Sequence, residues 1–400
     1  MSCLQLKCTC NDSENELSFS DENQTNGDQL YQHLSEASHL SEAIPLLPAA
    51  NDMIKYESDA TKFELLAVIG RSSHRATAVS LTKHIPSGHR IAIKCINLDA
   101  PGTDYDSVEH EILVTRQLKH ENVLPYLCAF VSSSEVWAVM PLMTYGSVRD
   151  ILDTHYPGGL PETAVSLILR DTLRALEYVH QAGFIHRSVK AAHLLISSKG
   201  RVVLTGFRYS CNVIVDARWQ PCIHDFPTDS IDNLNWLSPE VLQQNLKGYD
   251  SKSDIYSIGI TAFELANGVV PYTGLAPTQI LLAKLQGTKP TPPGSISDGA
   301  PLRESNRDTY KASGECSGQS STFCEEFSGF TSLCLQKDPL LRPSAHQLLL
   351  HGFIRLSRKL MTTLPVILAP ISPRAEVSRN TSSEPDEDAT GCTQEICWNF

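Results

Sequence analysis

The chain has 400 residues, of which 41% are hydrophobic and 20% are charged, a composition that excludes global disorder and a fibrous protein. The net charge of -12 comes from the two ends, because residues 1–60 hold 11 acidic and 2 basic side chains and residues 374–400 hold 6 and 2. The part between them is nearly neutral and lacks the basic stripe of a nucleic-acid binder. We therefore expect no nucleic-acid partner.

The chain shows neither of the two apolar signals that direct a protein to a membrane or to secretion. No window reaches the roughly 18 to 20 apolar residues of a membrane helix, and the start, MSCLQLKCTC, lacks the apolar core of a secretory signal. We expect an intracellular protein without a membrane partner, whose 12 cysteines are free thiols. Cys3, Cys8 and Cys10 also fit a zinc site or lipid attachment, but no second ligand group with finger-like spacing follows, which favours plain thiols.

The first part of the chain predicts a tail followed by a sheet. Residues 1–60 are rich in Ser, Asp, Glu, Asn and Gln without a sustained period, so we expect a disordered acidic tail. Strand-like runs come next, and a helix over residues 106–118 is predicted among them because apolar groups recur at helical spacing. The predicted strands cover residues 63–70, 77–84, 89–98, 123–131 and 135–143.

The second half of the chain is mostly helical in pattern. Apolar or amphipathic helices are predicted at 163–183 and 254–268, each ended by a glycine. Residues 286–322 are rich in Gly, Pro and Ser without a period, which predicts a flexible insert. Helical spacing resumes from 322 to about 360, and residues 356–400 are predicted to form an acidic tail broken by prolines.

This order of a small β lobe, a hinge and a large α lobe resembles a protein kinase over residues 61–355. The resemblance predicts an α+β, bilobal protein-kinase-like fold. IAIK at 91–94 looks like the Val-Ala-Ile-Lys of the third kinase strand, which places Lys94 where a kinase lysine reaches the nucleotide phosphates. Glu111 is the carboxylate on the apolar stripe of the following helix, so we expect it to pair with Lys94 rather than to be an unrelated surface charge.

The positions that perform phosphoryl transfer in kinases are replaced. FIHRSVKAAHLLIS at 184–197 resembles the catalytic loop, but Ser188 stands for the catalytic Asp and His193 for the metal-binding Asn. VVLTGFR resembles the strand and the Asp-Phe-Gly motif, but Gly206 stands for the metal-binding Asp and Arg208 for the Gly. We therefore predict no catalytic residue and no metal ligand, because loss of the base and both metal ligands should abolish transfer.

Part of a nucleotide site remains in the sequence. The glycine loop keeps Gly70 but has Ser72 and Arg75 near its second and third glycines, and bulkier residues hinder backbone approach to phosphates. The residues that the resemblance assigns to nucleotide binding are Ile69, Gly70, Ala92, Lys94, Glu111, Met140 and Met143. ATP is expected to bind without Mg²⁺ and to remain unhydrolysed.

The residues that hold the large lobe together in kinases are retained. WLSPE resembles the Ala-Pro-Glu motif and provides Glu240, SDIYSIG provides Asp254, and LLRPSA provides Arg342. One buried charge alone would be costly, so the presence of both Glu240 and Arg342 predicts a buried ion pair. Arg187 of the catalytic loop is expected to lack the phosphate partner that such an arginine has in kinases.

A kinase fold without its transfer chemistry describes a pseudokinase. The segments HRSVKAAHLLIS, TGFR, HDFP and WLSPEVLQQNLKGYDSKSDIYS, with the C-terminal Trp-x-Phe, closely resemble the STRAD adaptor pseudokinases, relatives of the sterile-20-like kinases. The retained Lys94 and the short cysteine-containing N-terminus favour the beta paralogue.

The resemblance implies a function and partners. It implies allosteric activation of the tumour-suppressor serine/threonine kinase upstream of the AMP-activated kinase, in a ternary complex with an armadillo-type scaffold, in the cytoplasm and the nucleus. The C-terminal Trp-x-Phe is expected to bind the scaffold. The residues expected to dock partners are Arg208, Phe226, Trp398 and Phe400.

Two other interpretations remain open. An unconventional, weakly active serine/threonine kinase could use His193 as a metal ligand, with Asp216 or Asp225 moving into the site. The acidic N-terminal tail could be the functional element, although such a run usually only solvates a chain. Replacement of all three polar groups of the transfer site together favours the adaptor.

Overall fold

The structure, a computed structural model, describes residues 54–71, 76–101, 103–215, 218–226, 233–244, 246–290, 323–359 and 363–371. Most of the predicted tail 1–60, most of the insert 286–322 and the end of the chain lie outside these residues. Ser72, Arg75, Trp398 and Phe400 lie outside them as well, so the predictions made for these four stay predictions.

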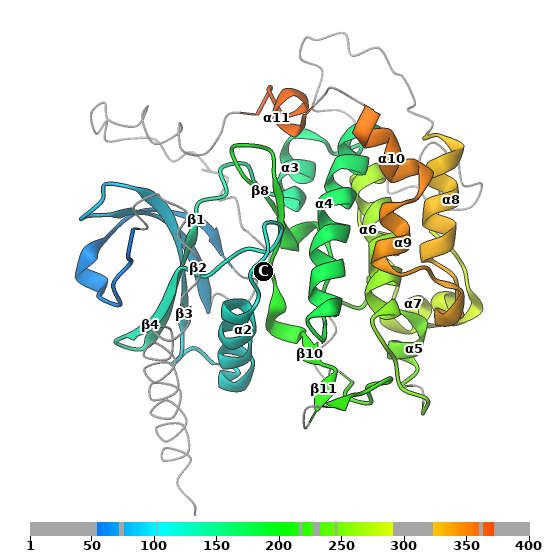
Figure 1. Ribbon diagram of the computed structural model, residues 1–400, viewed down its shortest axis with the longest axis horizontal. Helices are drawn as coiled ribbons and strands as arrows, with labels where there is room; N and C mark the ends of the chain where they lie inside the picture. Colours follow the sequence, from blue (N-terminus) through cyan, green and yellow to red (C-terminus); the bar gives the residue numbers. More distant parts are fainter. Residues whose placement is uncertain are drawn as a thin grey trace, which may run out of the picture. The chain divides into compact units, whose positions relative to one another are not determined.

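An antiparallel sheet forms the small lobe, with the strand order β1-β2-β3-β5-β4 (Figure 1). Its strands are β1 (Phe63–Arg71), β2 (Thr77–His84), β3 (Arg90–Asn97), β4 (Cys128–Ser132) and β5 (Glu135–Pro141). The predicted fourth strand was wrong at its start, since β4 begins at Cys128 rather than at residue 123. Pro125 has no N–H to contribute to a ladder, and Val123 instead forms an isolated bridge with Leu204 of the large lobe.

α2 (Tyr105–Gln117) connects β3 to β4, within one residue of the predicted helix. The Asp104 side chain accepts a hydrogen bond from the Ser107 N–H, which caps the first turn. The residues that α2 buries are Val108, Glu111, Ile112, Val114 and Thr115. A carboxylate, Glu111, therefore lies on the apolar face of the helix.

The helices α4 (Glu162–Gln181), α6 (Lys252–Asn267), α8 (Glu325–Cys334), α9 (Ala345–Leu349) and α10 (Gly352–Lys359) gather in the large lobe (Figure 1). Their apolar faces share one core, in which Leu173, Ile258 and Phe353 are fully buried. α6 ends at Gly268, whose φ of 75° gives the left-handed cap that the sequence predicted. The α+β, bilobal protein-kinase-like fold is confirmed.

Short elements build the region between the sheet and the helical core. β6 (Gly146–Ser147), β8 (Leu194–Ile196) and β9 (Val202–Leu204) form one small sheet, β7 (Phe184–Ile185) pairs with β10 (Cys211–Asn212), and β11 (Ile214–Val215) pairs with β12 (Arg218–Trp219). The remaining elements are η2 (Ala60–Lys62), α3 (Val148–His155), η3 (Ala191–His193), η4 (Phe207–Tyr209), α5 (Pro239–Leu242), α7 (Pro277–Gln286) and η6 (Pro339–Leu341). These short strands fix the loop that contains Ser188 and the turn that contains Gly206.

The large lobe extends beyond its predicted end at residue 355. α10 continues to Lys359, and a further helix, α11 (Leu364–Ile367), follows. The Tyr156 hydroxyl donates to the carbonyl of Ile367 over 3.1 Å. The residues of this segment that join the core are Leu364, Leu368 and Ile371. Prolines interrupt the helical spacing here, which is why the pattern predicted a tail.

Candidate functional site

An apolar cluster lies where the two lobes meet, and it contains most of the residues predicted to bind nucleotide. Its members include Ile69, Ala92, Met140 and Met143. Gly70 pairs with Val79 across the β1–β2 ladder. The members that the sequence analysis missed are Val79, Leu124, Leu195 and Val203, with the partly buried Tyr126 and Leu142. Val79 could have been found from the alternation of apolar and polar side chains along β2. The cluster has the apolar character that a site for a flat aromatic group such as adenine requires.

The Lys94 ammonium donates to both carboxylate oxygens of Glu111, over 2.7 and 3.0 Å, and this is the pairing that the sequence predicted. Both side chains are buried, and the Tyr126 hydroxyl donates to Glu111 Oε1 over 2.8 Å. Burial alone raises the pKa of Glu111, but the Lys94 charge and these hydrogen bonds more than offset it, so the pKa lies below its usual value. Glu111 is thus ionised at neutral pH and fixes the Lys94 side chain.

Ser188, His193 and Asn233, the first two of which the resemblance assigned to the transfer site, form a buried hydrogen-bonded group. The Ser188 hydroxyl donates to Asn233 Oδ1 over 3.0 Å. His193 Nδ1 lies 2.6 Å from the Ser188 carbonyl oxygen, and Nδ1 must hold the proton because a carbonyl only accepts. Burial, aided by the charges of Lys190 and His186, holds the pKa of His193 well below its usual value, so the ring is neutral. The Ser188 hydroxyl is therefore engaged inside the protein.

The His193 ring fills the space beside Gly206. Gly206 has a φ of 87°, and a Cβ added there would lie 2.5 Å from His193 Nδ1. An aspartate at position 206 would therefore need both a strained backbone and a displaced His193. Positions 193 and 206 are therefore coupled sterically, a relation that the sequence did not reveal.

Arg187, which is expected to lack a phosphate partner, is bound in the structure by other groups of the chain. Its Nη1 lies 3.1 Å from Asp225 Oδ2 and 3.0 Å from the Tyr249 hydroxyl. The guanidinium also donates to the carbonyl oxygens of Tyr209 and Ser210. Asp225 lies 38 residues further along the chain, and its carboxylate gives the Arg187 guanidinium an anionic partner. No motif or residue spacing in the sequence predicted the contact between Arg187 and Asp225.

Asp254 fixes the start of the same loop. Its carboxylate accepts the backbone N–H groups of His186 and Arg187, each over 2.8 Å, and contacts His180 Nε2 over 2.8 Å. Burial raises the pKa of Asp254, but the hydrogen bond and charge of His180 and the contacts with His186 more than offset it, and the pKa is lowered. Asp254 thus acts as the structural residue that the resemblance implied.

Glu240 and Arg342 form the predicted buried ion pair. The two guanidinium nitrogens of Arg342 lie 2.5 and 2.8 Å from the two oxygens of Glu240. Arg342 also donates to the carbonyl oxygens of Gln336, Lys252 and Lys337. The pair ties α5 to the loop before α9, and its bidentate geometry with further acceptors offsets part of the desolvation cost.

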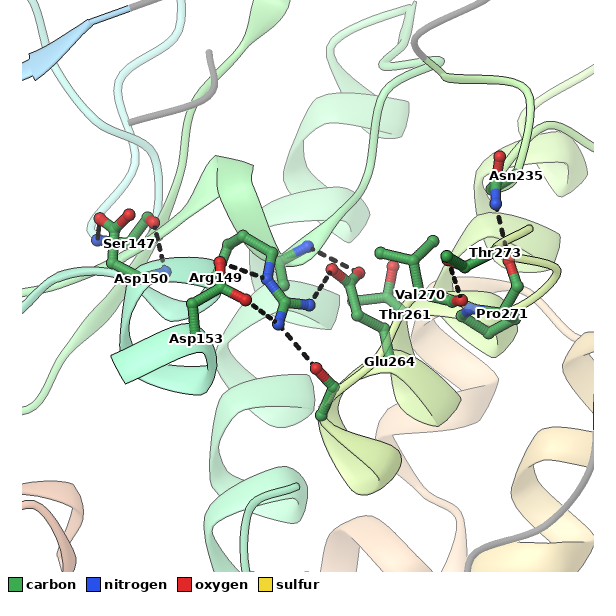
Figure 2. Close-up of polar contacts among 12 residues, drawn as sticks. Ser147, Arg149, Asp150, Asp153, Asn235, Thr261, Glu264, Val270, Pro271 and Thr273 are labelled. Carbon is green, nitrogen blue, oxygen red and sulfur yellow. Dashed lines mark hydrogen bonds and ion pairs between the residues drawn. The ribbon is translucent and has the colours of Figure 1, made fainter. Parts of the chain in front are cut away.

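A second buried carboxylate, Glu264 of α6, joins three segments of the large lobe. It accepts hydrogen bonds from Arg149 Nη1 over 3.1 Å, the backbone N–H of Ala191 over 3.1 Å and the Trp236 indole N–H over 3.0 Å. Figure 2 shows the Arg149 guanidinium between Asp153 and Glu264. Burial raises the pKa of Glu264 despite the opposing charge of Arg149. The sequence analysis did not single out Glu264.

The two described residues expected to dock partners make contacts within the chain. Arg208 Nε donates to the Ser107 hydroxyl of α2 over 3.1 Å, and the Arg208 charge also lowers the pKa of Glu111. The Phe226 ring lies 5.5 Å from that of Tyr249 and is partly buried. Both residues belong to the segment 208–240. Their roles in docking partners stay predictions.

Three further features concern only the residues that the structure describes. Within them, no cluster of three or more His, Cys, Asp and Glu side chains is arranged to hold a metal ion. None of the described helices combines the length and the apolar character needed to cross a bilayer. The six cysteines in the described ranges are free thiols, and burial raises the pKa of Cys95 to about 12.

Comparison with known proteins shows the family to which the chain belongs. A protein kinase domain profile matches residues 63–354. The chain is 39% identical to mouse STE20-related kinase adapter protein alpha over 83% of this chain and 82% of the relative, and also 39% identical to the human protein over the same shares. It is 35% identical to human STE20-related kinase adapter protein beta over 89% of this chain and 88% of the relative. The identity to the beta protein is slightly lower than that to the alpha proteins, so the predicted beta assignment is not settled.

Proposed function

Because the chain belongs to the family of STE20-related kinase adapter proteins, we propose that it is a catalytically inactive adaptor that binds a client serine/threonine kinase and activates it allosterically. The observation that carries the proposal is the His193 ring beside Gly206, where kinases hold a metal ion. Phosphoryl transfer depends mainly on positioning and on neutralisation of charge by Mg²⁺. A neutral imidazole in that space supports a protein that keeps the kinase shape without the reaction.

The remaining polar groups support inactivity as well. A serine hydroxyl cannot replace a carboxylate as general base, and that of Ser188 already donates to Asn233. The alternative, an unconventional kinase, needs new metal ligands. Asp225, one of the two that the sequence suggested, is engaged by Arg187, and the Nδ1 proton of His193 is directed at the Ser188 carbonyl. Asp216 lies outside the described residues.

We also propose that ATP binds without Mg²⁺ and is not hydrolysed. The adenine would lie against the apolar cluster that contains Ala92 and Met140, and Lys94, fixed by Glu111, would contact the phosphates. The residues present do not fit the Mg²⁺ ions of a kinase site, because Gly206 has no side chain to bind a metal and the His193 ring fills the space beside it. Bound nucleotide would stabilise the closed lobes by mass action.

The client proposed from the family is the tumour-suppressor kinase upstream of the AMP-activated kinase. The segment 208–240 is the proposed client surface, because buried charges hold two of its described residues: Arg187 binds Asp225, and Glu264 binds Trp236. The proposed second partner is an armadillo-type scaffold, bound through Trp398 and Phe400 at the chain end. The cytoplasm and the nucleus are the proposed compartments.

Reconstitution tests the adaptor function. The client's phosphorylation of a peptide is measured alone, with the full chain, and with the chain and the scaffold, and activity should rise with the chain and again with the scaffold. The variant Trp398→Ala/Phe400→Ala should lose only the second increase. An unchanged client activity after addition of the chain contradicts the proposal.

A direct assay tests inactivity. The full chain is incubated with ATP, generic substrates and Mg²⁺ or Mn²⁺, with Lys94→Ala as control. No phosphate transfer is expected. Turnover that Lys94→Ala abolishes would establish an unconventional kinase, whereas turnover that survives this variant indicates a contaminant.

A further inference from the structure

Lys284 of α7 is a buried cation that the proposed function does not use. Its exposure is 0%, whereas Lys289, five positions later, is exposed. No carboxylate within the described ranges pairs with Lys284, because Glu240 is already bound to Arg342. Burial lowers the pKa of Lys284 well below its usual value, and the charge of Glu240 opposes this. A cation in such a place is costly unless all its donors are satisfied.

The three N–H donors of the Lys284 ammonium all reach carbonyl oxygens of one backbone segment. Nζ lies 3.0 Å from the oxygen of Leu234, 2.7 Å from that of Asn235 and 2.6 Å from that of Leu237. The ammonium also faces the rings of Tyr256 and Tyr272, 5.3 and 5.5 Å from their centroids. Carbonyl dipoles and aromatic faces are environments that favour a cation.

Lys284 completes the hydrogen bonding of residues 233–237. The Asn233 carbonyl accepts two backbone N–H groups, and the Trp236 carbonyl accepts the Ser257 hydroxyl. The three remaining carbonyls are those that Lys284 binds. Without the ammonium, three nearby carbonyls would lose this donor together, which is expensive for buried groups.

We infer that Lys284 is a positioning residue whose ammonium holds the backbone of residues 234–237 in one conformation and so presents Leu234 and Asn235 at the partner-binding face. The assignment of this face to the client rests on the proposed function. Both side chains are half-buried, and the Asn235 amide donates to the Pro271 carbonyl over 2.7 Å, as Figure 2 shows. An internal cation thus orders the segment before Glu240 without phosphate or metal.

Hydrogen–deuterium exchange of the full chain tests the inference. Lys284→Met keeps a long side chain but removes the donors, Lys284→Gln keeps two of them, and Lys289→Met is the matched control. Amides of 233–242 should exchange on the order of 100-fold faster in Lys284→Met and less so in Lys284→Gln, while α4 stays protected. Lys289→Met should match the wild type.

Two results would overturn the inference. One is unchanged protection of residues 233–242 in Lys284→Met. The other is loss of protection over α4 in both Lys284 variants, which would assign the residue to the general core. Client affinity is the second readout, with a loss of about tenfold expected for Lys284→Met and none for Lys289→Met. If Lys284→Met kept full client affinity although residues 233–242 exchanged faster, the claim that these residues contribute to the client-binding face would be refuted. A wild-type chain that does not bind the client would refute the proposed function, while exchange would still decide the role of Lys284.

Discussion

Gly206→Ala is the smallest change that tests whether the His193 ring fills the space beside position 206. The backbone at Gly206 has a φ of 87°, and a non-glycine residue in this region costs about 1–2 kcal/mol. The new Cβ would also lie 2.5 Å from His193 Nδ1. The ring cannot move freely, because its Nδ1–H is bonded to the Ser188 carbonyl over 2.6 Å, and overpacking of this kind costs about 1–3 kcal/mol. The free energy of unfolding should therefore fall by about 2–5 kcal/mol.

Two comparisons separate the steric contribution from the backbone contribution. Gly274 has a φ of 89°, and a Cβ added there would meet no atom within 4 Å, so Gly274→Ala should cost only the backbone part, about 1–2 kcal/mol. In a His193→Ala background the clash is absent, and Gly206→Ala should cost a similar small amount. The double-mutant cycle should thus give a coupling of about 1–3 kcal/mol between positions 193 and 206.

The assay is urea unfolding of the full chain, followed by tryptophan fluorescence, for the wild type and the single and double variants. The reasoning would be refuted if Gly206→Ala cost no more than Gly274→Ala, or if its cost were equally large without the His193 ring. A coupling of the expected size also means that an aspartate at position 206 cannot create a metal site unless position 193 is changed as well.

Three further outcomes are expected. Burial lowers the pKa of His186 from 6.5 to about 4, and it also holds the pKa of His193 well below its usual value. As the pH falls below 6.5, these histidines bind protons in the unfolded chain but not in the folded protein, so each should reduce the free energy of unfolding by about 1.4 kcal/mol per pH unit. Urea unfolding from pH 7.5 to 4.5 should therefore show a shallower decline for His193→Asn. Arg342→Met leaves Glu240 as an unpaired buried carboxylate, so the free energy of unfolding in the same assay should fall by about 3–5 kcal/mol. The double variant Arg342→Met/Glu240→Met should lose less than the sum of the two single variants. ATP should raise the melting temperature equally with Mg²⁺ and with EDTA and not at all in Lys94→Met, and an EDTA-sensitive shift would contradict the metal-free site.

Patterns in short stretches of the sequence predicted those parts of the fold that depend on neighbouring residues. Strands, helices and terminal glycines follow from spacing, and the Lys94–Glu111 pair follows from one carboxylate on an apolar face opposite one kinase-like lysine. The start of β4 was wrong because alternation does not register the missing N–H of Pro125. The burial of α11 was missed because a four-residue helix has no period to detect.

The coupled parts of the site could not be predicted in this way, because their causes lie in contacts between distant segments. No pattern brings Asp225 to Arg187 across 38 positions, and none places the His193 ring against Gly206. Lys284 and Lys289 look alike in sequence, yet one is buried among carbonyls and the other is exposed. Such contacts depend on tertiary packing, which overrides local propensity.

These contacts share one consequence for an adaptor. An active kinase orders its corresponding segments with a metal ion and a phosphate, and their occupancy depends on ligand concentration and modification. Here the Asp225 carboxylate binds Arg187, the Glu264 carboxylate binds the Trp236 indole, and the Lys284 ammonium binds the backbone that follows Asn233. All three charges belong to the chain itself, so the order they impose does not vary with Mg²⁺ or phosphorylation. We therefore expect client binding by the proposed surface to depend on neither Mg²⁺ nor phosphorylation of the chain.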